Sequence, residues 1–144
     1  MDEFHLDLSP GEIEVIVNFL GYGRLSAPVW FIGLEEGLGK MNSEDTIKNL
    51  KARGSFEKCM DLHKAHLRLQ ENGQPIDITV KPPSTQVWQW MAKIMQALND
   101  HEDWKNLAPA KEYIRSSLGR CEGHTFLTEL SPIPSRATVD RNFG

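Results

Sequence analysis

The chain has 144 residues, of which 40% are hydrophobic and 25% are charged, and its formal net charge is −4 at pH 7. This length and composition are ordinary for one globular domain, so we expect residues 1–144 to form a single core. No run approaches the ~18 apolar residues of a membrane helix, and the acidic amino-terminal stretch does not resemble a secretory signal. We therefore expect a cytoplasmic protein with no membrane partner. The negative charge also argues against broad affinity for nucleic acid, which requires clustered Lys and Arg.

The first predicted helix begins after Ser9, which can cap it, with Pro10 in the first turn and Glu12 placed to complete a capping box. Gly21 and Gly23 follow its end. An apolar stripe at helical spacing predicts the buried face of this helix. The stripe consists of Ile13, Ile16, Val17 and Leu20.

Val29–Ile32 is a run of β-branched and aromatic residues that follows Pro28. The run is too short for a helix and is apolar on both faces, which predicts a buried parallel strand. A long helical region then follows, capped by Asn42 or Ser43, ending near Gln70 and broken near Gly54.

Lys48–Arg68 carries six Lys or Arg residues against only Glu57 and Asp61. A solvated helix face is the favoured interpretation of this segment, and a local basic groove is the alternative.

Ile76–Val80 alternates apolar and polar residues, which predicts a short edge strand before Pro82. Ser84 can cap the next helix. Residues at three- and four-residue spacing predict its buried face. They are Val87, Trp88, Met91, Ile94, Met95 and Leu98.

A last helix is predicted over about Pro109–Leu118, ending at Gly119. Thr125–Leu130 reads as a second buried strand, ended by prolines 132 and 134. This order of elements predicts an α/β protein in which two strands become parallel neighbours through a right-handed crossover.

Several residues could carry chemistry without defining a known motif. Cys59, His63 and His66 would share one face of a continuous helix, but no fourth ligand follows, so we predict an ordinary helix surface and no metal site. Two cysteines are too few for a disulfide scaffold or an iron–sulfur cluster, and we expect no cofactor. Trp88 and Trp90 could stack on a base, although core packing is favoured for Trp88.

The turn Gly33–Gly39 contains two carboxylates between glycines, at the expected carboxyl end of the first strand. Glycines let a ligand approach the backbone, and a carboxylate can orient or deprotonate water. A glycine-rich turn with solvated acids is the alternative. The turn is not a phosphate-binding P-loop, because Met41 follows Lys40 where that motif requires Ser or Thr. No G-x-S-x-G motif supports acyl transfer either.

The stretches "FIGLEEGLG" and "FLTELSPIPS" together resemble the first half of the uracil-DNA glycosylase-like superfamily. In the first stretch the resemblance makes Glu35 the catalytic residue that positions water. It also makes Gly33, Leu34, Glu36 and Gly37 part of the base pocket. Glu36 stands where that family has proline.

In the second stretch the resemblance assigns base binding to Glu129 and Ser131. Glu129 stands where the family has an asparagine, whose amide both donates to and accepts from a base edge. The resemblance implies a three-layer α/β/α fold with a short, mainly parallel sheet. It also implies a divergent or C-terminally shortened member of the superfamily.

An intact relative would flip a base out of nucleic acid and attack the sugar carbon with a positioned water. The expected partner is therefore DNA or a nucleotide, bound weakly, and base release is the implied activity. The alternatives are a noncatalytic module that binds a nucleotide, small ligand or protein in the same cleft, and a hydrolase of another kind built around Glu35. An unpaired sheet edge would also favour self-association.

Overall fold

The computed structural model describes residues 7–34, 43–71 and 86–133. Within these ranges the chain forms a mixed α/β protein with an open, mostly parallel sheet of four strands. The strands are β1 (Gly21–Tyr22), β2 (Val29–Gly33), β3 (Cys59–Met60) and β4 (Thr125–Glu129). The helices are α1 (Pro10–Val17), α2 (Ser43–Arg53), α3 (Leu62–Glu71), α4 (Gln86–Leu98) and α5 (Leu107–Ser116).

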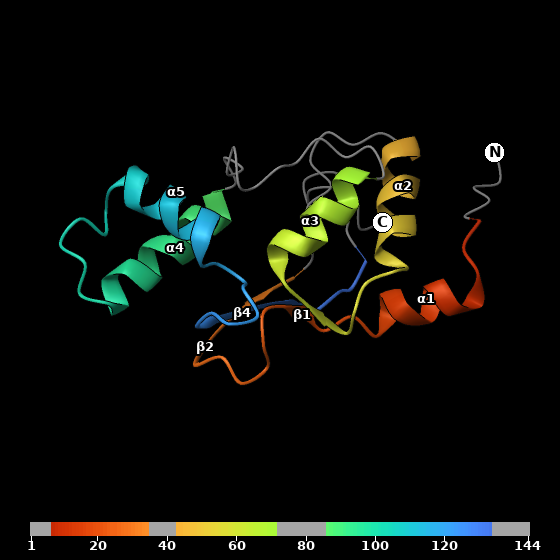
Figure 1. Ribbon diagram of the computed structural model, residues 1–144, viewed down its shortest axis with the longest axis horizontal. Coiled ribbons are helices and arrows are strands. Elements are labelled where there is room, and N and C mark those ends of the chain that lie inside the picture. The colour runs from red at the N-terminus through yellow and green to blue at the C-terminus, as the bar shows by residue number, and fades with distance from the viewer. Residues whose placement is uncertain (1–6, 35–42, 72–85, 134–144) are drawn as a thin grey trace, which may run out of the picture.

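The sheet order is β2-β4-β1-β3. β2 pairs with β4 and β1 pairs with β3 in parallel, while β1 and β4 are antiparallel. Figure 1 shows α2 to α5 on the same side of this sheet, with α1 beside it. The expectation of an α/β protein with a mainly parallel sheet is therefore confirmed. None of the described helices combines the length and apolar character needed to cross a bilayer.

β4 is the second predicted strand, and its first three residues are fully buried. β2 is the first predicted strand, but the expectation that it is buried on both faces is wrong. It lies at the margin of the sheet, and Trp30 and Ile32 are 47% and 63% exposed. Side chains alternate across a strand, so those on the face away from α2 to α5 meet solvent. Whether this edge promotes self-association stays a prediction.

The amino end of α1 forms as predicted. Ser9 accepts a hydrogen bond from the Glu12 N–H at 3.2 Å, and the Glu12 carboxylate accepts one from the Ser9 N–H at 2.7 Å. The predicted apolar stripe is wrong, because only Ile16 of that stripe is buried. Val15 and Phe19 pack against the core instead, so α1 contacts the domain through a face rotated from the one that the pattern indicates.

The long helical region breaks after α2, where Gly54 follows Arg53, as predicted. The rest of that region is not one helix. β3 follows the break, and α3 begins only at Leu62, after Asp61. The strand was missed because two residues give no usable periodicity. The predicted strand Ile76–Val80 and the predicted cap Ser84 lie outside the described residues.

On α4, the predicted stripe is divided between the core and the surface. Trp88 and Met91 pack against the core and Met95 is buried. The other three stripe residues are exposed, so this part of the expectation is wrong. They are Val87 at 57%, Ile94 at 46% and Leu98 at 61%.

The core lies between the sheet and helices α2 to α5, where α4 and α5 also pack against each other. α5 begins two residues earlier than predicted, after Asn106, and Gly119 follows its end with φ +62°. Large side chains with almost no exposed surface come from β3, α3, α5, the segment after α5 and β4. They are Met60, Leu62, Ile114, Leu118 and Phe126.

Close approach of β1 to β4 depends on Gly21. Its φ is +150°, and a Cβ there would collide with the carbonyl oxygen of Leu127. Any side chain at residue 21 would therefore both strain the backbone and push β1 away from the central strand.

We expect Gly21→Ala to destabilise the fold by about 1–3 kcal/mol or more, the usual scale for a strained backbone conformation. Gly11→Ala is the matched control. It lies in α1 with no atom within 4 Å of the added carbon, and helix propensity favours Ala by about 0.5–1 kcal/mol. Urea unfolding of both variants measures the difference. Equal midpoints for the two variants would contradict the close β1–β4 packing.

Candidate functional site

The carboxyl ends of β2 and β4 lie side by side. The parallel register runs from Val29 opposite Thr125 to Gly33 opposite Glu129. The pairing continues beyond the strands, because the Ser131 N–H donates to the Leu34 carbonyl at 2.8 Å. Ligands of open α/β sheets usually bind outside the carboxyl ends of strands. The two stretches that carry the resemblance therefore meet where a ligand site is expected.

Gly33 is required at its position by the side chain opposite it. A Cβ at residue 33 would collide with the Glu129 carboxylate, which lies over the Gly33 backbone. One carboxylate oxygen of Glu129 is buried. The absence of a side chain at Gly33 thus leaves space for the Glu129 carboxylate at the carboxyl ends of β2 and β4.

Glu129 and Ser131 line a small recess at the carboxyl end of β4, on the side of the sheet that the helices cover. The free volume of the recess is about 10 Å³, roughly the minimum for one water molecule. The recess therefore has room for about one water beside the partly buried Glu129 carboxylate, and a larger ligand can reach only its opening. The other described residues around it are Phe19, Leu20, Gly21, Tyr22, Arg53, Leu127 and Pro132.

Arg53 at the end of α2 brings a buried positive charge to the recess. Its side chain is held by Asn49, whose Oδ1 accepts from Arg53 Nε at 2.6 Å. Arg53 Nη1 also donates to the Tyr22 hydroxyl at 3.4 Å, and the guanidinium lies 5.7 Å from the centre of the Phe56 ring. A carboxylate and a guanidinium thus share one small recess. Such a site can order a water molecule or hold a polar ligand group at its mouth.

Four of the residues that the sequence interpretation assigned to the site lie together: Gly33, Leu34, Glu129 and Ser131. Two of them, Glu129 and Ser131, line the recess. The other three residues assigned to the site, Glu35, Glu36 and Gly37, lie outside the described residues.

Arg53 and Tyr22 were not predicted to belong to the site. The one local signal for Arg53 is its i, i+4 spacing from Asn49, which lets the two side chains meet on a helix. Tyr22 gives no local signal. It lies next to β4 only because β1 pairs with that strand.

The proposed common helical face of Cys59, His63 and His66 does not exist. Cys59 lies in β3, while both histidines lie in α3. His66 Nδ1 donates to the Leu62 carbonyl at 2.9 Å. In the described part of the chain, no group of three His, Cys, Asp or Glu side chains is arranged to hold a metal ion.

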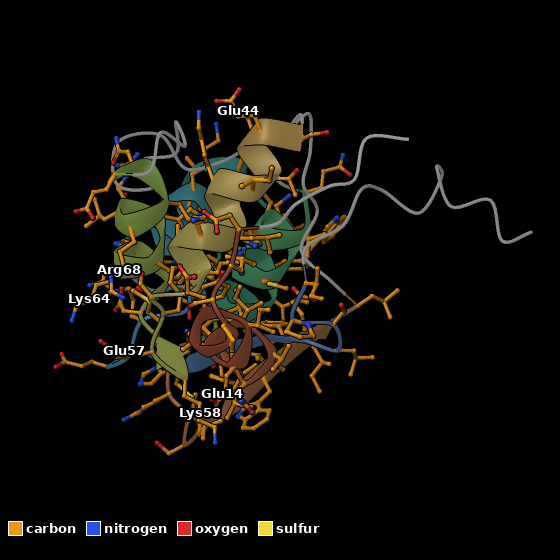
Figure 2. All side chains as sticks on the ribbon, turned by 90° about the vertical axis from the view of Figure 1, so that its right-hand side faces the viewer. Glu14, Glu44, Glu57, Lys58, Lys64 and Arg68 are labelled. Carbon is orange, nitrogen blue, oxygen red and sulfur yellow. The ribbon has the colours of Figure 1, made fainter. Side chains whose placement is uncertain are left out.

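The basic segment Lys48–Arg68 does not form one helix face either, because α2, β3 and α3 divide it. Lys48 pairs with Glu44 at 2.7 Å, and Arg68 donates to the Ser55 carbonyl. In Figure 2, Lys64 and Arg68 lie along one side with Glu57, and Lys58 lies at the bottom near the Glu14 label. Carboxylates are thus interspersed among the cations, and no continuous basic groove results from these residues.

The prediction that Trp88 packs against the core is confirmed. Trp88 packs edge-on against His66, with ring centres 5.4 Å apart. Trp90 is 62% exposed on α4.

The comparison with known proteins identifies no relative: no family model, curated protein or solved structure matches the chain.

Burial raises the pKa of both cysteine thiols. For Cys121 the nearby Asp61 carboxylate raises the pKa further, because a second negative charge there is unfavourable. For Cys59 burial outweighs the opposing effect of Lys58. A raised pKa lowers the thiolate fraction at any given pH, so both side chains are poor nucleophiles near neutrality.

We expect iodoacetamide to alkylate Cys121 more slowly at pH 7.5 than a short cysteine peptide, although Cys121 is exposed. The rate should keep rising with pH above the point where the peptide levels off. Mass spectrometry of the native chain measures both cysteines, and the urea-unfolded chain is the control. Native alkylation of Cys121 as fast as that of the peptide would contradict the raised pKa.

Proposed function

We propose that this chain is a uracil-DNA glycosylase-like domain that binds a nucleobase at the paired carboxyl ends of β2 and β4. In the described residues α2 to α5 form one helical layer on one side of the sheet, so the three-layer α/β/α arrangement of that superfamily stays a prediction within this proposal. The observation that carries it is the register of Gly33 opposite Glu129, extended by the hydrogen bond from Ser131 to Leu34. Two stretches that are almost a hundred positions apart in the chain lie side by side here, which supports the proposal.

The proposed reaction is release of a base by water attack, with Glu35 positioning the water. The small recess beside Glu129 supports this proposal, since a site for one ordered water is what such a hydrolysis needs. The base would lie at the mouth of the recess, near Leu34 and Ser131.

A second candidate is a noncatalytic module that binds a nucleotide at the same edge. Glu129 favours it, because a carboxylate only accepts hydrogen bonds and cannot read a base edge as an amide does. The cations of α2 and α3 and Lys58 are interspersed with carboxylates, which favours a small ligand over duplex DNA, whose phosphates need a continuous basic surface.

Base release distinguishes the two candidates. We expect Glu35→Gln to lower the release of uracil from a labelled oligonucleotide by about 10²-fold or more, the usual effect of removing a general base. Glu14→Gln, at an exposed residue of α1, is the matched control and should change the rate little. Melting curves of both variants check folding, and equal rates for the wild type and Glu35→Gln would defeat the catalytic assignment.

Binding tests the site independently of catalysis. We expect uracil or uridine monophosphate, titrated into the labelled protein, to shift backbone NMR signals of Leu34 and Ser131. Glu129→Gln should change the affinity by about 10-fold, the scale of one charge-assisted hydrogen bond, while the exposed Glu14→Gln should leave it unchanged. If the wild type showed no binding and no base release, the proposal as a whole would be overturned.

A further inference from the structure

A second, larger cleft lies on another part of the molecule. It is open, has a volume of about 680 Å³, and lies between the start of α3, the end of α5 and the segment that leads into β4. Figure 1 shows these segments converging, and the Leu62 N–H donates to the Gly119 carbonyl at 3.0 Å. The cleft adjoins the amino end of β4, whereas Glu129 lies at the carboxyl end. It is therefore separate from the site of the proposed function.

A buried carboxylate organises the floor of this cleft. Asp61 is 5% exposed, and its Oδ1 accepts from the N–H groups of His63 at 3.0 Å and Lys64 at 3.3 Å. Its Oδ2 accepts from the Cys121 N–H at 3.2 Å and pairs with Arg120 Nε at 3.0 Å. Both oxygens are thus occupied by protein donors, and the carboxylate offers little to a ligand.

Arg120 is held from two sides. Its Nε meets Asp61, and its Nη1 donates to His63 Nδ1. A guanidinium has five N–H donors, and these two contacts use two of them. Within residues 7–34, 43–71 and 86–133, the other three have no protein partner. The Arg120 side chain is 36% exposed and lines the cleft, so a ligand in the cleft can reach the guanidinium.

Lys64 adds a second cation to the same cleft, and no described carboxylate pairs with its ammonium group. Ser116, Ser117 and Asn99 add further polar groups. Glu122 and Glu57 are opposing charges near the cleft, and both are exposed to solvent. The amino end of α3 and the carboxyl end of α5 both border the cleft, and their opposite dipoles offset each other. The side chains therefore determine which ligand charge the cleft prefers, and most of their polar groups can donate hydrogen bonds.

We propose that this cleft binds a small molecule through a phosphate group, with Arg120 and Lys64 as the two anchoring cations. The planar guanidinium matches two phosphate oxygens at once, and Lys supplies a mobile second charge. The volume is in the range of small-molecule sites, so the ligand can be larger than phosphate itself. Asp61 and His63 act as positioning residues, because they hold Arg120 and do not meet the ligand.

Calorimetric titration of the full chain with inorganic phosphate and with glycerol 2-phosphate tests this proposal. We expect saturable binding of at least one of them with a dissociation constant of about 1 mM or lower. Tighter binding of the ester identifies a site for a phosphorylated small molecule, and equal binding identifies phosphate as the group recognised. Saturable binding of neither compound would overturn the proposal.

Variants test whether binding occurs in this cleft. Arg120→Gln should weaken binding by about 10-fold or more, the scale of a lost charge-assisted contact. Lys64→Gln should weaken it about 3- to 10-fold without affecting folding, because none of the described residues depends on its ammonium group. Arg115→Gln is the matched control, since Arg115 is an exposed residue of α5 that pairs with Glu112 outside the cleft. Unchanged affinity in folded Lys64→Gln and Arg120→Gln would refute the assignment.

Discussion

The parallel pairing of β2 with β4 is the constraint on which the rest of the structure depends. It joins residues that are almost a hundred positions apart in the chain, from Val29 opposite Thr125 to Gly33 opposite Glu129. Parallel neighbours cannot be joined by a tight turn, so the intervening segment has to cross over the sheet. Helices α2 to α5 all belong to that crossover and lie on one side of the sheet (Figure 1). The same pairing brings the two stretches of the candidate site together.

β4 also connects this pair to the other half of the sheet. Leu127 lies opposite Phe31 on one side and opposite Tyr22 on the other. The Thr125 hydroxyl accepts a hydrogen bond from the Gly119 N–H at 2.9 Å, which fixes the turn after α5 against the start of the strand. One central strand thus carries a polar region at each end. Glu129 lies at its carboxyl end, and the cleft that contains Arg120 lies before its amino end.

The two regions differ in the role of their carboxylates, the buried Asp61 and the partly buried Glu129. Asp61 is surrounded by backbone donors and Arg120, so it serves to orient a cation toward an open cleft. Glu129 instead lies over a glycine, beside a recess with space for about one water. The first arrangement presents donors to a ligand, and the second places a carboxylate and the Arg53 guanidinium around a recess at the carboxyl end of β4. The two sites therefore differ in composition and lie at opposite ends of one strand.

Local sequence determined the elements whose signals are short-range. The capping box at Ser9 and Glu12, the break at Gly54 and the two long strands each depend on residues within about one turn or one strand. For the same reason the sequence could place Gly33 and Glu129 at strand ends, because each lies within or directly after an apolar run. The resemblance then predicted that they lie together, and the register does place them opposite each other.

Only the tertiary structure decided which apolar faces are buried and which polar residues share a site. Ile13 and Ile94 fit a helical stripe as well as Ile16 does, but burial depends on whether another element covers that face. Tyr22 and Arg53 reach the recess, and Arg120 meets Asp61, through contacts between segments at least 30 positions apart. No periodicity within one segment records such a contact. It depends on the pairing of strands and on the path of the crossover that β2 and β4 impose.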